Sequence, residues 1–470
     1  MTAKRRTKII ATLGPATDDP EILEELVIAG MNVARINMSH ATPEQTERLV
    51  KTIRAVSEKT GKRVSILMDT QGPAIRTGDL KTNLELEPGQ RIALTVRGEQ
   101  SEEHVSVHVN YDELVDDISL GDIVMVDNGE IELKVLEKQK NQLHCEVLTP
   151  GVLGSRRHIN LPGVRVNLPA LTEKDIRDIE LGIDLGVDFF AMSFVREAED
   201  VMKLKNILDY RKAPQKVISK LEDQEGIRNL DEIIEVSDGV MVARGDLGIE
   251  VHFEELPIVQ RRIVKSCIRR GTPVIVATHM LESMVENPAP TRAEITDVAN
   301  AVFEQADAVM LSGETSVGAY PVKCIEIMDR IATRIEESGG AGYSHGAELD
   351  TVYAKLVKAG ALLATECDAD ALIVFTRSGE MAEKVSWLRP LEFPIYAFTD
   401  NEVLINQLPL LWGLQPFLIE FDEDPNQNVA RAIAKLKQHR LVHGDQTIVA
   451  VTETHVRGKL VDSILMEKID

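Results

Sequence analysis

The feature of this sequence that most constrains its fold is a series of eight short apolar runs separated by segments with helical periodicity. In chain order the runs are TKIIATLG, NVARINMSH, VSILMDTQG, DFFAMSFV, KVISKLE, GVMVARGD, PVIVATHM and AVMLSGE. The intervening segments carry helix signals, such as Thr42 followed by Pro43 at one start and Gly61 at the end. Strands that alternate with helices form parallel β/α units, and eight such units favour a closed (β/α)8 barrel.

The eight units are interrupted once and are followed by sequence of a different texture. Residues 72–166 contain short alternating segments, a Pro88-Gly89 turn and an Asn128-Gly129 hairpin signal. After the glycine-rich residues 338–342, helical segments alternate with ALIVFTRSG, PIYAFTD and QTIVAVTE. We therefore predict an α/β protein with three parts: a (β/α)8 TIM barrel over 1–71 and 167–338, an inserted β-barrel-like lid domain over 72–166, and a C-terminal α/β domain over 339–470.

Composition narrows the classes of partner. The chain has 53 basic and 76 acidic residues, a net charge of −23, and such a surface repels a phosphate backbone, so nucleic-acid binding is not expected. No stretch approaches the roughly 18 apolar residues of a membrane span. The cysteines are far apart and none has metal-site spacing, which predicts reduced thiols and a cytoplasmic protein. We expect the basic start, MTAKRRTK, to be a solvated tail rather than an export signal.

Polar side chains gather where the eight runs end. Alternate residues of a strand share a face, and in a barrel one face looks into the lumen. On this basis we expect the following sets to look inward at the C-terminal mouth, where barrel enzymes build their sites: Arg35 with Asn37 and Ser39, Lys220 with Glu222, Arg244 with Asp246, Ser312 with Glu314, and the strand-end residues Asp69 and Thr278.

This set of residue types has a chemical meaning. Glu222 and Asp246 offer the hard oxygen ligands that Mg2+ prefers, so a divalent cation is implied. A cationic complement suited to phosphoryl groups and small carboxylates comes from Arg35, Arg76, Lys220 and Arg244. The turn at 245–248 brings backbone N–H groups to a plausible carboxylate cradle. Any one of these ions alone is equally explained by a salt bridge at the rim, but strand ends that converge on one mouth favour a ligand or metal that completes the set.

The motifs resemble those of the pyruvate kinase family over nearly the whole chain. The resemblance rests on NVARINMSH, MDTQGPAIRTG, INLPGVRVNLPALTEKD, VISKLEDQEGIRN, MVARGDLGIE, ATHMLESM, NPAPTRAE and MLSGETSVGAYP, which occur in the family's order. It implies transfer of the phosphoryl group of phosphoenolpyruvate to ADP, giving ATP and pyruvate, in the last step of glycolysis. It also implies a homotetramer, and a lid that closes over the nucleotide.

The resemblance further implies roles for the matching positions. Lys220, Thr278, Arg35 and Arg76 would be catalytic, with Thr278 delivering the enolate proton through water. Substrate would be bound by Arg35, Lys220, Gly245, Asp246, Thr278 and Ser312. Mg2+ or Mn2+ would be held by Glu222 and Asp246, and K+ by Asn37, Ser39, Asp69 and Thr70. The sugar-phosphate effector loop would include Thr376, Ser378 and Gly379.

Several positions depart from the family's usual pattern. Ala74 stands where the family has Glu or Lys, a choice that tracks K+ dependence, and Asn167 replaces an Asp of the hinge. His279 replaces a Gln, and strand parity points it away from Thr278, which favours a packing role. Glu380, Met381 and the run ETHVRGKLVDS differ from the family's effector loops. We therefore expect fructose 1,6-bisphosphate to be a poor activator, with a monophosphorylated sugar or nucleotide, or no effector, in its place.

Two other classes of function share parts of this pattern. A Mg2+-dependent lyase or mutase of the phosphoenolpyruvate-handling barrels also places carboxylates and cations at its strand ends, but a large inserted lid disfavours it. A metabolite sensor with a degenerate barrel would lack one or more of the residues proposed for catalysis, and Lys220, Glu222, Asp246 and Thr278 are all present.

Overall fold

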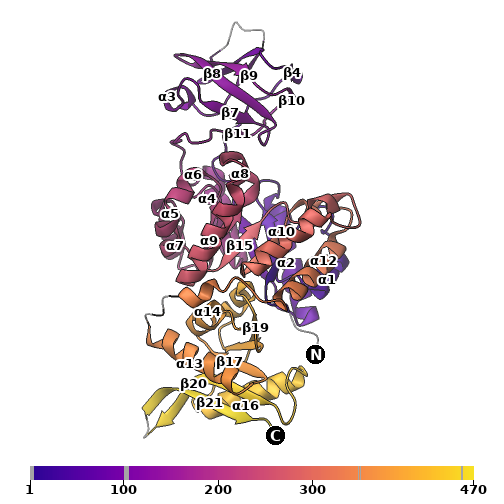
Figure 1. Ribbon diagram of the computed structural model, residues 1–470, viewed down its shortest axis with the longest axis vertical. Coiled ribbons are helices and arrows are strands. Elements are labelled where there is room, and N and C mark those ends of the chain that lie inside the picture. The colour runs from indigo at the N-terminus through magenta and orange to yellow at the C-terminus, as the bar shows by residue number, and fades with distance from the viewer. Residues whose placement is uncertain (1–4, 100–104, 348, 350, 457–458) are drawn as a thin grey trace.

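The computed structural model describes residues 5–99, 105–347, 349, 351–456 and 459–470. Along the long axis of the molecule, the strands of the inserted segment lie at one end, the closed barrel in the middle and the C-terminal sheet at the other end (Figure 1). Among these residues no helix is both long and apolar enough to cross a membrane.

The closed barrel has eight parallel strands in the order β1-β16-β15-β14-β13-β12-β3-β2. These strands coincide with the eight apolar runs, which confirms the predicted (β/α)8 barrel. Their bounds are β1 Lys8–Thr12, β2 Val33–Asn37, β3 Ser65–Asp69, β12 Phe189–Met192, β13 Lys216–Leu221, β14 Gly239–Ala243, β15 Val274–Ala277 and β16 Ala308–Leu311.

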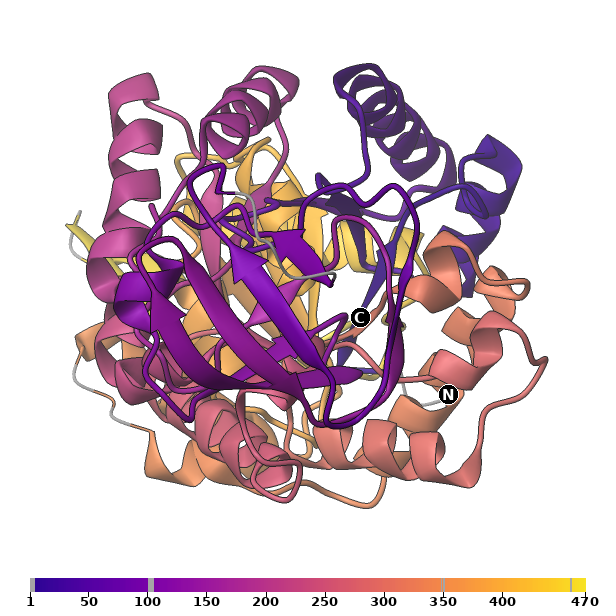
Figure 2. The same ribbon diagram turned by 90° about the horizontal axis from the view of Figure 1, so that it is seen from above.

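Helices surround the barrel on its outer face (Figure 2). Their bounds are α1 Pro20–Ala29, α2 Pro43–Thr60, α4 Glu173–Leu185, α5 Ala198–Arg211, α6 Gln224–Arg228, α7 Leu230–Val236, α8 Arg244–Glu250, α9 Leu256–Arg270, α10 Arg292–Phe303, α11 Gly313–Ser316 and α12 Pro321–Glu336, with the 3-10 turns η1 Glu282–Val285 and η2 Tyr343–Gly346. Helix α2 begins at a capping box on Thr42 and ends at Gly61 in the left-handed conformation, as its sequence predicts.

Two apolar layers fix the direction in which each strand faces. One cluster packs the outer face of the strands against the helices, and a second, smaller cluster fills the lumen. On β13, for example, Val217 belongs to the outer cluster and Ile218 to the luminal one. Lys220, two residues after Ile218, therefore looks into the lumen above an apolar floor.

The inserted domain consists of β4 Leu84–Leu86, β5 Arg91–Thr95, β6 Ser106–His108, α3 Leu114–Asp117, β7 Ile123–Val126, β8 Ile131–Gln139, β9 Gln142–Val147, β10 Gly151–Leu153 and β11 Ile159–Asn160. In the described part of the chain its strands form an open six-stranded sheet, β11-β7-β8-β9-β5-β6, and a β10-β4 ribbon rather than a closed barrel. Strands β7 and β8 pair as the expected antiparallel hairpin, with Asn128 and Gly129 both at positive φ. The inserted β domain is thereby confirmed.

The C-terminal domain is a five-stranded sheet in the order β19-β18-β17-β20-β21. Its elements are α13 Val352–Glu366, β17 Ala371–Phe375, α14 Glu380–Trp387, β18 Ile395–Thr399, α15 Leu404–Gln407, η3 Leu408–Leu410, β19 Leu414–Leu418, α16 Pro425–Gln438, β20 Thr447–Val456 and β21 Lys459–Lys468. The sequence analysis found three of these strands. It missed β19, an edge strand that contains Pro416, and β21, which returns antiparallel to β20.

The N-terminal basic segment is not a solvated tail where the structure describes it. Residues 1–4 lie outside the described part, but Arg5 forms an ion pair with Asp329, 2.7 Å between Nε and Oδ1. The Thr7 backbone N–H donates to Glu336, and Lys8 Nζ donates to the Leu414 carbonyl at 2.7 Å. The expectation of a solvated tail is wrong for residues 5–8, because acidic side chains of α12 and a backbone carbonyl of the C-terminal domain accept hydrogen bonds from them.

Candidate active site

Lys220 is the centre of a buried ionic network at the C-terminal mouth of the barrel. Its Nζ lies 3.1 Å from Asp69 Oδ1 and 2.9 Å from Glu222 Oε1, and it donates to Ser193 Oγ at 2.8 Å. Lys220 closes the luminal face of β13, and Glu222 follows that strand by one residue, so the alternation seen in the sequence does bring the two side chains together.

Arg35 extends this network to the neighbouring strand. Its Nη2 lies 2.6 Å from Asp69 Oδ2, and its Nη1 donates to Thr12 Oγ1 at 2.9 Å. Asp69 therefore lies between two cations, with one carboxylate oxygen facing each. The Asp69 side chain is 1% exposed, so both ion pairs are shielded from water and hold their geometry.

The proton affinities in this network follow from burial and from the neighbouring charges. Burial alone would lower the pKa of Lys220, but Asp69 and Glu222 together raise it above its ordinary value. Burial would raise the pKa of Asp69, and the charges of Lys220 and Arg35 lower it instead. For Glu222, burial dominates and raises the pKa to about 7, although Lys220 opposes the shift. The site thus holds a permanently charged ammonium, that of Lys220. Beside it lies the Glu222 carboxylate, whose negative charge is disfavoured by burial and would be stabilised by a further cation.

Asp246 lies beside this network on helix α8. Its side chain is 36% exposed, and its proximity to Glu222 contributes to the raised pKa of that group. Asp246 Oδ1 also lies 3.9 Å from Nδ1 of His158, which belongs to the inserted domain. Burial lowers the pKa of His158, which favours the neutral ring. Two carboxylates, one buried and one open to the cleft, suit a hard divalent cation.

Arg244 does not share a face with Asp246, which corrects the sequence analysis. Strand β14 ends at Ala243 and Arg244 begins α8, so strand alternation no longer applies and the expected turn at 245–248 is helical. The Arg244 guanidinium contacts Asp297 at 2.6 Å and donates to the carbonyls of Ala277 and Thr278. Arg244 therefore positions the end of β15 and is not one of the cations that face the cleft.

Thr278 lies in the expected place but in an unexpected conformation. Its φ is +67°, and the next residue, His279, has φ +53°, a region that side-chain-bearing residues rarely occupy. Thr278 Oγ1 accepts a hydrogen bond of 2.8 Å from Gly245 N–H at the start of α8. Strand parity fails here, and His279 is exposed, so the packing role expected for it is wrong. Strain of this kind is characteristic of functional sites.

Ser312 and Glu314 are also beyond the end of their strand. Strand β16 stops at Leu311, and the two residues belong to the tight turn that starts α11. Glu314 is buried and accepts hydrogen bonds from the backbone N–H groups of Ser312 and Leu281 at 2.7 and 3.0 Å. Glu314 thereby holds two loops of the mouth together. Because both residues follow the strand, strand alternation does not determine their positions.

The four residues predicted to bind K+ line the ends of β2 and β3 and the segments that follow them. Asn37 and Asp69 are register partners on these strands. Asn37 Oδ1 accepts from the Ser39 N–H at 3.1 Å, and Thr70 Oγ1 donates to the Ala191 carbonyl at 3.2 Å. The structure therefore brings hard oxygen donors to one corner of the mouth, while Asp69 is already engaged by two cations.

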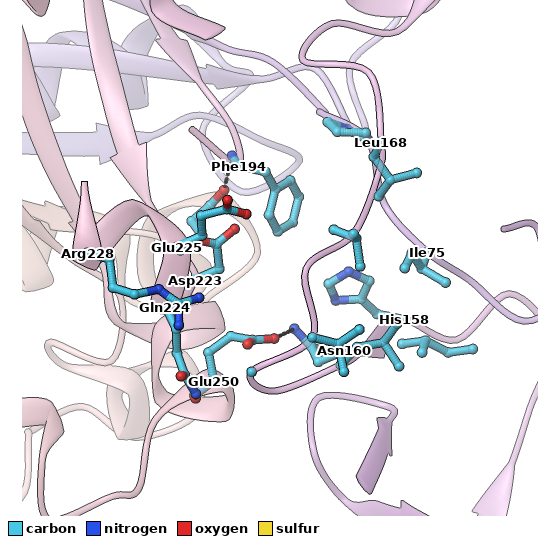
Figure 3. Close-up of a pocket in the computed structure, with 17 residues that line it drawn as sticks. Ile75, His158, Asn160, Leu168, Phe194, Asp223, Gln224, Glu225, Arg228 and Glu250 are labelled. Atoms are coloured by element: carbon cyan, nitrogen blue, oxygen red, sulfur yellow. Dashed lines mark hydrogen bonds between the residues drawn. The ribbon is translucent and has the colours of Figure 1, made fainter. Parts of the chain in front are cut away.

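The inserted domain approaches the barrel at a pocket beside this mouth (Figure 3). His158 and Asn160 reach it from the inserted domain, and Phe194, Glu222, Gln224 and Glu250 reach it from the barrel. Arg76 lies in the hinge, the segment near residue 72 where the chain passes from the barrel into the inserted domain. It forms a β-bridge with His158, and its Nη1 donates to the Arg156 carbonyl at 3.1 Å. Arg76 is thus near the cleft and partly engaged within the inserted domain.

The expected effector loop is remote from the mouth, in the C-terminal domain. Thr376 Oγ1 accepts from the Gly379 N–H at 2.8 Å, and Glu380 is the first residue of α14. The run ETHVRGKLVDS covers the end of β20 and the start of β21, and its residues 457–458 lie outside the described part of the chain.

Several residues of the site were missed by the sequence analysis. Ser193 bonds Lys220, Phe194 N–H donates to Glu222 Oε2 at 2.6 Å, and Asn160 and Glu250 bond across the pocket. Ser193 and Phe194 follow the strand in DFFAMSFV and could have been found there. The alternation in His-Ile-Asn-Leu at 158–161 predicts that His158 and Asn160 share a face, but not what that face meets.

Comparisons with known proteins show which family the chain belongs to. The family described as "Pyruvate kinase, barrel domain" matches residues 4–325, and "Pyruvate kinase, alpha/beta domain" matches residues 354–462. Curated pyruvate kinases of Sporosarcina psychrophila and Geobacillus stearothermophilus are each 41% identical to the chain, over 458 and 462 residues, covering 95% of it and 77% of their own length. The crystal structure of a pyruvate kinase from Cryptosporidium parvum superposes with a TM-score of 0.93 at 32% identity, covering 99% of this chain and 96% of its own.

The fold and the site define a barrel phosphotransferase with a buried lysine and two carboxylates at its mouth. The chain belongs to the pyruvate kinase family. Its reaction is the transfer of the phosphoryl group of phosphoenolpyruvate to ADP, which gives ATP and pyruvate.

Proposed function

We propose that this reaction takes place at the mouth of the barrel, with Lys220 as the central catalytic group. The observation that carries the proposal is the ammonium of Lys220, which is held in the lumen within 3.1 Å of both Asp69 and Glu222. Its raised pKa keeps it charged throughout the neutral range. A fixed cation in a site shielded from water stabilises the charge that develops on a transferring phosphoryl group and on the enolate.

A divalent cation, Mg2+ or Mn2+, would be held by Glu222 and Asp246. The donor set fits, because both groups offer carboxylate oxygens and the Asp246 side chain is 36% exposed, so a cation can reach it from the cleft. When bound, the cation neutralises phosphate oxygens and the substrate carboxylate. Arg35, already oriented by Asp69 and Thr12, would bind the phosphoryl group, with Arg76 approaching from the hinge.

Thr278 would hold the proton that the enolate receives, through a water molecule, while the substrate carboxylate lies against the backbone groups of Gly245 and Asp246. The hydrogen bond from Gly245 N–H to Thr278 Oγ1 supports this placement, because it joins the proposed carboxylate cradle to the proton donor. Ser312, whose Oγ is buried and has no hydrogen-bond partner in the described residues, is the further proposed contact to substrate.

Thr278→Ala tests this role. We expect protonation of the enolate to slow more than phosphoryl transfer, because the hydroxyl acts on the proton and does not bind phosphate. The measurement is the exchange of pyruvate methyl protons with solvent, compared with the rate of ATP formation. Exchange that survives while ATP formation collapses would show that the role is wrong.

A K+ ion is the least constrained part of the proposal. Oxygen donors for it would come from Asn37, Ser39, Asp69 and Thr70. The side chain of Ala74 carries no ammonium group, so the protein itself supplies no positive charge at this position that could replace K+. We therefore expect an external K+ requirement. Full activity in a buffer free of sodium and potassium, with an organic cation instead, would refute it.

Regulation by fructose 1,6-bisphosphate is expected to be weak. Glu380 at the start of α14 places a negative charge beside Thr376, Ser378 and Gly379, and it opposes a doubly charged phosphate. A monophosphorylated sugar or nucleotide, or no effector, is expected instead. The phosphoenolpyruvate saturation curve, recorded with and without millimolar fructose 1,6-bisphosphate, decides this, and a large leftward shift would contradict the expectation.

The remaining proposals concern organisation and assembly. We place the lid at 72–166, the barrel at 1–71 and 167–338, and the C-terminal domain at 339–470, and we propose a cytoplasmic homotetramer. Exposed apolar side chains such as Phe253, 86% exposed, and Ile258, 59% exposed, support a subunit interface at the start of α9. Light scattering at micromolar concentration tests the assembly, and a monomer would contradict it.

A further inference from the structure

One of the contacts between the inserted domain and the barrel is made by a two-residue strand, β11, and its neighbours. Ile159 of this strand and the adjacent Leu161 pack into the core of the inserted domain. The alternate residues, His158 and Asn160, point the other way, toward the barrel (Figure 3). A single short segment thus carries both the apolar anchor in the lid and the polar contacts to the barrel.

Asn160 makes its polar contact with Glu250, the last residue of α8. Asn160 Nδ2 donates to Glu250 Oε1 at 3.2 Å, and the two side chains belong to residues that are only 6% and 8% exposed. A hydrogen bond between an amide and a carboxyl group is directional, and burial keeps water from replacing either partner. The contact is therefore suited to fixing the distance between the lid and α8.

Glu250 also connects the two segments that carry the proposed divalent-cation ligands. Helix α8 bears Asp246 one turn before Glu250, and the start of this helix is tied to Thr278 through Gly245. The Glu250 carbonyl accepts from Gln224 Nε2, and Gln224 lies two residues after Glu222. A displacement of Glu250 would consequently shift the positions of both the Asp246 and the Glu222 carboxylates.

We propose that Asn160 and Glu250 form a latch that sets the position of the lid and, through α8 and Gln224, positions Asp246 and Glu222 for the reaction. Both are positioning residues, since neither is placed against substrate. The inference rests on the proposed roles of Glu222 and Asp246. It adds a coupling between lid position and the geometry of the cation ligands.

The first test is a set of variants at the latch. Glu250→Leu and Asn160→Leu each remove the hydrogen bond, and we expect kcat to fall on the order of 10- to 100-fold, as for outer partners of metal ligands, with a much smaller change in the KM for phosphoenolpyruvate. Glu250→Gln keeps an oxygen acceptor for Asn160 and is expected to retain kcat within about threefold. Glu254→Gln and Asn83→Ala, both at exposed positions, are the matched controls.

The double variant Glu250→Leu/Asn160→Leu makes the coupling measurable. If the two residues act as one latch, the double variant loses no more activity than either single variant. Losses that multiply, or a Glu250→Leu enzyme with unchanged kcat, would overturn the proposal. If Glu250→Leu does not fold, Asn160→Leu and Glu250→Gln still decide it, because the first must lose activity and the second must keep it.

Hydrogen exchange separates this proposal from the cation assignment. In the free enzyme without divalent cation, Asn160→Leu is expected to speed amide exchange in the lid hinge and in α8, whereas Glu222→Gln leaves the hinge as in the wild type. Unchanged exchange in Asn160→Leu would overturn the latch. Unchanged Mn2+ affinity in Glu222→Gln and Asp246→Asn would overturn the cation site while leaving the latch result intact.

Discussion

The two ends of the barrel bury charged groups in different ways. At the N-terminal end, Asp307 accepts from the Val274 and Trp412 backbone N–H groups and pairs with Arg389. At the C-terminal mouth, Lys220 is held by three side chains, those of Asp69, Glu222 and Ser193. Asp307 joins the barrel to the C-terminal domain through Arg389 and Trp412, whereas Lys220 lies at the mouth where barrel enzymes bind substrate, so we expect a structural role at one end and a catalytic role at the other.

The largest expected effect on turnover comes from removing the cation at the mouth. Lys220→Met should lower kcat on the order of 10^2- to 10^3-fold, or about 3–4 kcal/mol, because it deletes a positioned charge used in the transition state. We expect a modest loss of stability, since Glu222, whose pKa is raised to about 7, can take up a proton in place of the lost ion pair. Turnover close to wild type would contradict the central role of Lys220.

The corresponding change at the opposite end should have the reverse profile. Arg389→Met leaves Asp307, 1% exposed, without its cation, and should lower the free energy of unfolding by about 3–5 kcal/mol. The kcat of the folded fraction should change little, because Arg389 is remote from the mouth. Urea unfolding combined with active-site titration checks this. If Arg389→Met unfolded like the wild type but turned over slowly, the structural role assigned to this end of the barrel would be contradicted.

The two carboxylates at the mouth should affect cation affinity rather than folding. Glu222→Gln and Asp246→Asn preserve side-chain volume and remove the charge that a hard cation prefers, so each should raise the Mg2+ concentration for half activity about tenfold or more. Thermal unfolding without Mg2+ serves as the control. Unchanged Mg2+ titrations in both variants would place the ion elsewhere.

A last effect is the pH dependence of stability that Glu250 contributes. Burial raises the pKa of Glu250 from 4.5 to about 7, with Asp223 and Asp246 adding to the shift and Asn160 opposing it. Because the folded-state pKa is raised, this group stabilises the fold at low pH, and that stability is lost as the pH rises through about 7. Glu250→Gln should remove this dependence, which the change of pKa from 4.5 to about 7 makes worth roughly 3 kcal/mol between about pH 4.5 and 7. Parallel pH profiles of unfolding for wild type and variant would contradict it.

The sequence predicts the barrel and part of the mouth because both depend on local periodicity. Eight apolar runs define eight strands, and alternation along β13 correctly pairs Lys220 with Glu222. The same rule fails for Arg244 and Ser312, because a helix begins at once or one residue later, whereas Glu222 precedes the next helix, α6, by two residues. Alternation is informative where the backbone stays extended and loses its meaning where a helix begins at the strand end.

Contacts between domains were beyond prediction for a different reason. The alternation of His158 and Asn160 is visible in the sequence, but their partners, Asp246 and Glu250, lie about 90 residues away on another domain. Likewise, Arg5 looks like part of a solvated basic tail until α12 supplies Asp329. Such pairings depend on how the domains pack, which periodicity does not encode.

The central claim is that the charges at the mouth carry phosphoryl transfer between phosphoenolpyruvate and ADP. The most direct test is pyruvate release from phosphoenolpyruvate by the purified protein, measured across a Mg2+ titration, with and without ADP and with and without K+. The account predicts that pyruvate forms only when ADP and the divalent cation are both present, with one ATP made for each pyruvate, and that K+ increases the rate. Consumption of phosphoenolpyruvate without ADP, or no consumption under any of these conditions, would contradict it.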